Sequence, residues 1–198
     1  MSLEIERKFL VKGEAWRGLA EPVRIRQGYV ATRDGTTVRV RVAGDAAFIT
    51  LKDRAVGLVR HEFEYPIPPA DAEAILDAMC GNLVEKNRYR IPAAEPGLAW
   101  EVDEYFGANA SLVTAEIELP DEKTVVALPD WIGREVTDDH RYKNNNLAVH
   151  PFSEWRDGSG QECDMLEKGH DMAEDKSQWC TCRLTSRRGW RWQMGGLG

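Results

Sequence analysis

Glu4-Ile5-Glu6-Arg7-Lys8 opens the chain with two carboxylates and then an ammonium at every second position. In a β-strand, successive side chains point to opposite faces. A strand therefore places Glu4, Glu6 and Lys8 in one row and turns the apolar side chains the other way. A helix would scatter these three charges over a wide arc. The stretch predicts a strand whose polar face is selected for chemistry.

Further strand patterns follow, separated by turn signals such as Asp34-Gly35 and Gly44-Asp45. One helix interrupts them, since apolar residues recur at helical spacing between Pro68-Pro69 and Gly81. The expected strands span residues 3–11, 23–32, 36–42, 46–53, 58–66, 83–91, 99–106 and 112–119. Eight short strands and one helix predict an α+β chain built on a sandwich or a barrel, and eight strands close readily into a barrel.

Most of these strands carry charges on one face. The rows are Arg39 and Arg41; Thr50, Lys52 and Arg54; Arg60, Glu62 and Glu64; Lys86, Arg88 and Arg90; Glu101 and Asp103; and Glu116 and Glu118. A single row is ordinary for a solvent-exposed face. Repetition weakens that interpretation, because like charges two residues apart repel mildly and call for a partner of opposite sign. Arg and Lys bind phosphate and clustered carboxylates bind hard divalent cations, so the pattern predicts a pocket for a metal–polyphosphate complex.

Composition sets the remaining bounds. The 198 residues suit one domain with an appendage. The net charge of −7 argues against a general nucleic-acid binder but not against an anionic ligand. No apolar run is long enough for a membrane span, and Met1 leads into a charged strand rather than a signal peptide, so a cytoplasmic protein is expected. The four cysteines do not form a disulfide framework for a chain of this size.

These residues also resemble the CYTH superfamily, the triphosphate tunnel metalloenzymes. Residues 4–8 match its ExExK signature, and the later matches fall in the family's order. Those matches are Arg26-Gln27-Gly28-Tyr29, Arg39 with Arg41, Thr50-Leu51-Lys52, Glu62 with Glu64, Lys86 with Arg88, Asp103, and Glu116 with Glu118. Residues 131–137 and 141–144 resemble the segment after the family's last strand. The expected domains are therefore a tunnel domain, residues 1–155, and a C-terminal extension of unknown role, residues 156–198.

The resemblance implies a closed eight-stranded antiparallel β-barrel, forming a tunnel with its charged faces inward and its helices packed outside. The residues implied to bind the triphosphate are Lys8, Arg39, Arg41, Lys52, Lys86 and Arg88. Those implied to hold Mg²⁺ or Mn²⁺ are Glu4, Glu6, Glu62, Asp103, Glu116 and Glu118. The catalytic candidates are Lys8, Tyr29, Glu116 and Glu118. Weaker candidates, each equally suited to a solvated tunnel mouth, are Glu64, Arg54, Arg60 and Arg90.

The implied reaction is metal-dependent hydrolysis of a triphosphate. The choice of inorganic triphosphate, cleaved to pyrophosphate and phosphate, rests on resemblance to small bacterial members. A class IV adenylyl cyclase, a thiamine triphosphatase and a nucleoside triphosphatase share the tunnel and stay open as alternatives. A polyphosphate- or nucleotide-binding module without catalysis is the alternative from another class, but a mere anion binder gains nothing from six carboxylates. The expected partner is the small-molecule substrate, with neither nucleic acid nor membrane, and a homodimer stays open.

The last part of the chain has a different character. Residues 156–198 hold three of the four cysteines and show no sustained apolar period. Their run at 187–192 is basic and aromatic, as in segments that bind nucleic acid or membrane surfaces. The composition favours a poorly ordered or incidental tail over either of those roles.

Overall fold

The structure is a computed structural model that describes the backbone of residues 2–54 and 59–157, with side chains for residues 5–54 and 61–155. All of these residues fall in one compact unit, Met1–Leu166. The predicted extension, residues 156–198, lies outside the described residues apart from the backbone at 156 and 157. None of the helices in the described part of the chain has the length and apolar character needed to span a membrane.

Within the described residues, nine strands form one antiparallel sheet. They are β1 (Ser2–Val11), β2 (Pro22–Arg33), β3 (Thr36–Ala43), β4 (Ala46–Lys52), β5 (Val59–Ile67), β6 (Leu83–Pro92), β7 (Ala99–Tyr105), β8 (Val113–Glu118) and β9 (Ile132–Glu135). The helices are α1 (Pro69–Met79), α2 (Asn144–Val149) and the short 3-10 helices η1 (Gly107–Asn109), η2 (His140–Tyr142) and η3 (Phe152–Asp157). The strand order is β5-β4-β3-β2-β6-β7-β8-β1-β9. The predicted α+β class and antiparallel sheet are confirmed.

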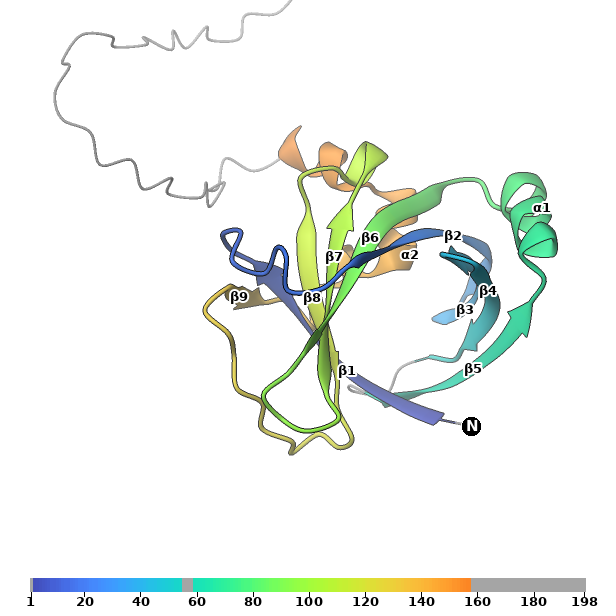
Figure 1. The fold of residues 1–198 in the computed structure, drawn as a ribbon. Coiled ribbons are helices and arrows are strands. Elements are labelled where there is room, and N and C mark those ends of the chain that lie inside the picture. The colour runs from blue at the N-terminus through green and yellow to red at the C-terminus, as the bar shows by residue number, and fades with distance from the viewer. Residues whose placement is uncertain (1, 55–58, 158–198) are drawn as a thin grey trace, which may run out of the picture. The chain divides into compact units, whose positions relative to one another are not determined.

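The opening strand has three neighbours. Residues 6–10 of β1 pair with β8, residues 2–5 pair with β5, and Phe9 and Val11 pair with β9. Figure 1 shows the sheet curling so that β1 and β5 run side by side, although β5 begins the strand order. The alternating stretch at the start of the chain therefore joins strands that are far apart in the sequence.

The prediction of eight strands was wrong by one. Ile132–Glu135 lacks a sustained apolar alternation, and these residues form a strand, β9, because they pair with the far end of β1. Gly133 makes that approach feasible, since a Cβ there would lie 2.9 Å from the carbonyl oxygen of Leu10. The ninth strand thus depends on a long-range contact that no local pattern announces.

Apolar side chains on the outward faces of the strands form the core. Phe9, Trp100 and Trp131 meet in edge-to-face ring pairs with centroids 5.6 and 5.9 Å apart. α1 packs on the outside against β2, β3 and β4, burying Ala72 and Leu76 (Figure 1). Because the apolar faces are used for packing outside, the charged faces are turned inward.

Residues 136–155, called the C-terminal segment below, lie against another part of the sheet. α2 packs against β2 and β6 (Figure 1), and Leu147 joins a buried cluster with Val84 and Tyr105. The backbone N–H of Val136 donates to the carbonyl oxygen of Lys8 at 2.8 Å. The segment is therefore fastened to the strand that carries the opening charge row.

Candidate functional site: a charge-lined cavity

The charged faces of the strands line a cavity of about 630 Å³. Each strand from β1 to β8 contributes at least one lining residue. The charged residues that line it are Glu6, Lys8, Arg39, Arg41, Lys52, Glu62, Glu64, Arg88, Arg90, Glu101, Glu116, Glu118 and Lys143. The period-two rows of the sequence thus meet in one space, as strand geometry requires when the apolar faces pack outward.

Lys8 is held at the wall by two acceptors. The antiparallel register sets Lys8 opposite Glu116, and its Nζ lies 2.6 Å from Glu116 Oε1. The same Nζ donates to the carbonyl oxygen of Tyr142 at 3.0 Å. Lys8 is 5% exposed and Glu116 8% exposed, so the pair is largely shielded from water.

Electrostatics keep both members of this pair charged. Burial is the largest single effect and lowers the pKa of Lys8, but Glu116, Tyr105 and Glu6 together outweigh it and the net pKa is raised. Burial likewise raises the pKa of Glu116, while Lys8 and Arg88 together bring it well below its ordinary value. The cavity wall therefore presents a fixed ammonium and a fixed carboxylate at neutral pH.

A second cluster gathers the cations of β3 and β4. Arg41 Nη2 donates to Glu64 Oε2 at 2.9 Å, and Arg39 Nη2 donates to Thr50 Oγ1 at 3.1 Å. Lys52 Nζ lies 2.9 Å from Glu62 Oε2. Each acidic partner also lines the cavity, so these contacts orient the cations toward the same space.

The two arginines of this cluster retain unused donors. The Nε atoms of Arg39 and Arg41 are buried and have no hydrogen-bond partner among the described residues. Burial, with the adjacent Arg39 guanidinium, lowers the pKa of Arg41. Buried donors without acceptors are rare in folded proteins. An anion in the cavity would offset the repulsion between the two guanidiniums.

Arg88 links the cavity to a buried pair behind it. Its Nη2 reaches Glu116 Oε2 at 2.9 Å and Asp103 Oδ2 at 2.6 Å, and its Nη1 bonds Glu101. Asp103 Oδ2 also lies 2.5 Å from Lys86 Nζ. Asp103 and Lys86 are 0% and 1% exposed, and neither lines the cavity.

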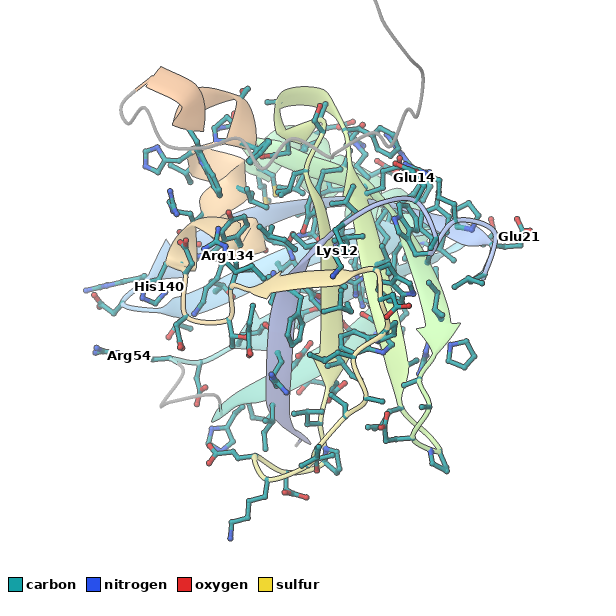
Figure 2. The ribbon with its side chains drawn as sticks, turned by 90° about the vertical axis from the view of Figure 1, so that its left-hand side faces the viewer. Lys12, Glu14, Glu21, Arg54, Arg134 and His140 are labelled. Atoms are coloured by element: carbon teal, nitrogen blue, oxygen red, sulfur yellow. The ribbon has the colours of Figure 1, made fainter. Side chains whose placement is uncertain are left out.

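Most of the predicted site residues meet in the cavity. Those that line it are Glu6, Lys8, Tyr29, Arg39, Arg41, Lys52, Glu62, Glu64, Arg88, Arg90, Glu116 and Glu118. Lys86 and Asp103 do not line the cavity, because both are fully buried behind its wall. There they form an ion pair with each other. Arg54 does not line the cavity, and Figure 2 shows its side chain pointing away from the sheet. The side chains of Glu4 and Arg60 lie outside the described residues.

Several lining residues were not among the predicted site residues. Glu101 shares the period-two row of Asp103, so the alternation could have marked it. Lys143, Asn144 and Asn145 come from the C-terminal segment and reach the cavity only through tertiary packing. His140, just before them, is labelled in Figure 2 and does not line the cavity. No local pattern could have distinguished Lys143 from its neighbours.

Carboxylates of the cavity wall face one another across paired strands. Two pairs of carboxylates are direct cross-strand partners, Glu6 with Glu118 and Glu101 with Glu116. Like charges in that relation are destabilising unless a cation lies between them, and the Arg88 guanidinium already contacts both members of the second pair. In the part of the chain that the structure describes, no three His, Cys, Asp or Glu side chains form a ready-made metal cage. Mg²⁺ is ordinarily bound through one or two carboxylates, waters and substrate phosphates, so the donor set fits this metal.

The fold and the cavity define a class. A curved antiparallel sheet lined by guanidiniums, ammoniums and opposed carboxylates is suited to a small, multiply charged anion bound with a hard cation. The chain belongs to the CYTH family, since the CYTH domain model matches residues 2–149. The resemblance seen in the sequence is thereby confirmed.

Two curated relatives carry a more specific name. A protein of Acetivibrio thermocellus named inorganic triphosphatase is 47% identical over 158 residues, covering 79% of this chain and 100% of that protein. A protein of Nitrosomonas europaea with the same name is 40% identical over 151 residues, covering 74% of this chain and 97% of that protein. A crystal structure of an inorganic triphosphatase superposes with a TM-score of 0.56 at 37% identity, covering 75% of this chain and 96% of that chain.

Proposed function

We propose that this protein is a hydrolase that cleaves inorganic triphosphate into pyrophosphate and phosphate with the help of Mg²⁺ or Mn²⁺. The observation that carries the proposal is the cavity, where cations from facing strands converge on one space of about 630 Å³. Relatives that share 47% and 40% of their aligned residues with this chain are named inorganic triphosphatase. The proposed setting is the cytoplasm, with the small-molecule triphosphate as partner.

The proposed fold of the site is a tunnel closed by the strands. Support comes from the pairing of β1 with β5, in which Ser2 faces Glu62 and Ile5 faces Val59. Those contacts link the first strand of the order to the eighth, and β9 then lies beside β1 outside that ring of eight. Closure of this kind would separate an interior of charges from an apolar exterior.

The proposed triphosphate contacts are the cations that line the cavity. Arg39 and Arg41 would bind phosphate oxygens through their guanidinium groups, because both residues line the cavity. Lys8, Lys52 and Arg88 would add charge-assisted hydrogen bonds to phosphate oxygens. Lys86, being buried behind Arg88, would act on the phosphates through its charge rather than by direct contact.

The proposed metal ligands are carboxylates of β1 and β8. Glu6 and Glu118 face each other across the strand pair, and Glu116 follows on the same row. Glu4 continues the row of β1 by its position in the strand. When bound, Mg²⁺ or Mn²⁺ supplies charge neutralisation for the triphosphate and lowers the pKa of a bound water. Glu62 and Asp103 complete the proposed set; lysines already contact them, as Lys8 and Arg88 contact Glu116.

The residues themselves provide positioning and electrostatic stabilisation. Phosphoryl transfer needs little covalent chemistry from the protein, so charges fixed around the transferred group carry most of the catalysis. Lys8 is fixed by Glu116 and the Tyr142 carbonyl and needs no rearrangement to neutralise developing charge. Tyr29 lines the cavity, and its hydroxyl accepts a hydrogen bond from Gln27 Nε2 at 3.3 Å, which would help to orient the ring toward the bound phosphates.

The test is phosphate release from inorganic triphosphate, ATP and thiamine triphosphate, each assayed with Mg²⁺, with Mn²⁺ and with EDTA. We expect release from inorganic triphosphate that ceases in EDTA. A rate no higher than the EDTA control for all three substrates would refute the enzyme proposal and favour a binding module. Formation of cyclic AMP and pyrophosphate from ATP would instead identify an adenylyl cyclase.

A further inference from the structure

Tyr105 carries a buried hydroxyl group that has no role in the proposed reaction. It ends β7, is 2% exposed and does not line the cavity. Its hydroxyl donates to Asn144 Oδ1 at 2.9 Å and lies 3.5 Å from Thr114 Oγ1.

The acceptor of this hydrogen bond belongs to the C-terminal segment. The cavity wall includes three residues of this segment, Lys143, Asn144 and Asn145. Asn144 lies 39 positions after Tyr105 in the sequence, so only tertiary packing brings the two together. The ring of Tyr105 packs in the cluster that also holds Tyr142 and Leu147. The ring of Tyr105 therefore contributes to the packing of the core, and its hydroxyl contributes separately by placing Asn144.

We propose that Tyr105 is a positioning residue that sets the affinity of the cavity for triphosphate. Its hydroxyl holds Asn144, and Asn144 fixes residues 143–145 as the wall at this end of the cavity. Without the hydroxyl, the ring still packs, but the segment loses the hydrogen bond by which Tyr105 ties the Asn144 side chain to β7. Substrate binding must then order the wall itself, which weakens binding without altering the charges that carry the reaction.

The inference rests on the proposed function, and its test measures binding and turnover separately. The variant Tyr105→Phe removes only the hydroxyl oxygen. We expect KM for inorganic triphosphate to rise about tenfold, the factor that the loss of one buried hydrogen bond produces. We expect kcat to stay within about twofold of the wild type, because the side chains of the cavity are unchanged.

A matched control removes a hydroxyl from the outer surface. Tyr89 donates to Glu104 Oε2 at 3.2 Å, and Tyr89 does not line the cavity. Tyr89→Phe should leave KM unchanged. Asn144→Ala should reproduce the rise in KM, and the double variant Tyr105→Phe/Asn144→Ala should add no more than a small further rise, because both changes remove the same contact.

Hydrogen exchange gives a readout that does not depend on activity. Backbone amides of residues 143–149 should exchange faster in Tyr105→Phe than in the wild type, while amides of β3 and β4 keep their protection. An unchanged KM and unchanged exchange in Tyr105→Phe would overturn the inference, as would a fall in kcat with KM unaffected. A wild type that releases no phosphate would instead refute the proposed function, so the two failures are distinguishable.

Discussion

The stability of the protein at alkaline pH should depend on Lys86, because this lysine is buried behind the cavity wall. Its Nζ lies 2.5 Å from Asp103 Oδ2 and the side chain is almost fully enclosed. Burial, followed by the adjacent Arg88, lowers the pKa of Lys86 from 10.5 to about 8 despite the Asp103 carboxylate. The perturbation is Lys86→Met, which keeps a side chain of similar length and removes the titrating group.

The size and sign of the effect follow from linkage. Between pH 8 and 10.5 the folded protein has released this proton while the unfolded chain still binds it, so stability rises with pH. One pKa unit corresponds to about 1.4 kcal/mol, and the lowering from 10.5 to about 8 therefore corresponds to about 3 kcal/mol. That contribution is fully present above pH 10.5 and is lost as the pH falls through 8.

The assay is urea unfolding of both proteins at intervals between pH 7.5 and 10.5. The difference in unfolding free energy, wild type minus Lys86→Met, should increase by about 3 kcal/mol across this range. Lys12→Met is the control, because Lys12 is an exposed lysine outside the cavity (Figure 2). A difference that stays flat for Lys86→Met would show that Lys86 does not titrate in this window and would refute the reasoning.

The remaining predictions concern packing and charge. Gly28→Ala should lower the unfolding free energy by about 1–3 kcal/mol, because the new Cβ would lie 2.6 Å from the Cβ of Cys80; Gly81→Ala, with nothing within 4 Å, is the control in the same denaturation assay. Lys52→Ala should reduce kcat/KM for inorganic triphosphate roughly tenfold to hundredfold by removing one charge-assisted contact, with an unchanged circular dichroism spectrum, and a near-normal rate would contradict its place at the site. Glu116→Ala should cost about 3–5 kcal/mol of stability, because Lys8 and Arg88 lose a shared partner; thermal melts with and without triphosphate should show part of that loss restored by the anion, and a melting temperature equal to the wild type would contradict it.

The alternation of charged and apolar residues along each strand predicted which side chains share a face, but not how deeply each is buried. The rows that contain Lys8, Arg39 and Glu116 could be assigned to one face each, because side chains alternate strictly along a strand. The same rule could not show that the row of β6 runs from the cavity at Arg88 to a fully enclosed position at Lys86. Depth within a curved sheet depends on the strands and helices that cover it, and no single strand records those neighbours.

Elements outside the charged rows show the same difference between what a local pattern reveals and what tertiary contacts decide. Pro69–Met79 and its spacing of apolar residues could be recognised as a helix from a local period. β9 has no such period and exists because Ile132–Glu135 lies against β1. Lys143 lines the cavity between two residues that are bonded to the sheet. Lys8 donates to the backbone carbonyl of Tyr142, and Tyr105 donates to the side chain of Asn144.

The sequence by itself determined which side chains share a strand face, and with them the charge-lined, anion-binding character of the protein. Glu6 and Lys8 stand in one row in any strand, since the period of two is a property of the backbone. Only the tertiary structure decided which charges meet: Lys8 with Glu116 at the wall, and Lys86 with Asp103 behind it. Pairing register, curvature and burial arise from contacts between distant segments, and those contacts convert rows of charge into a site.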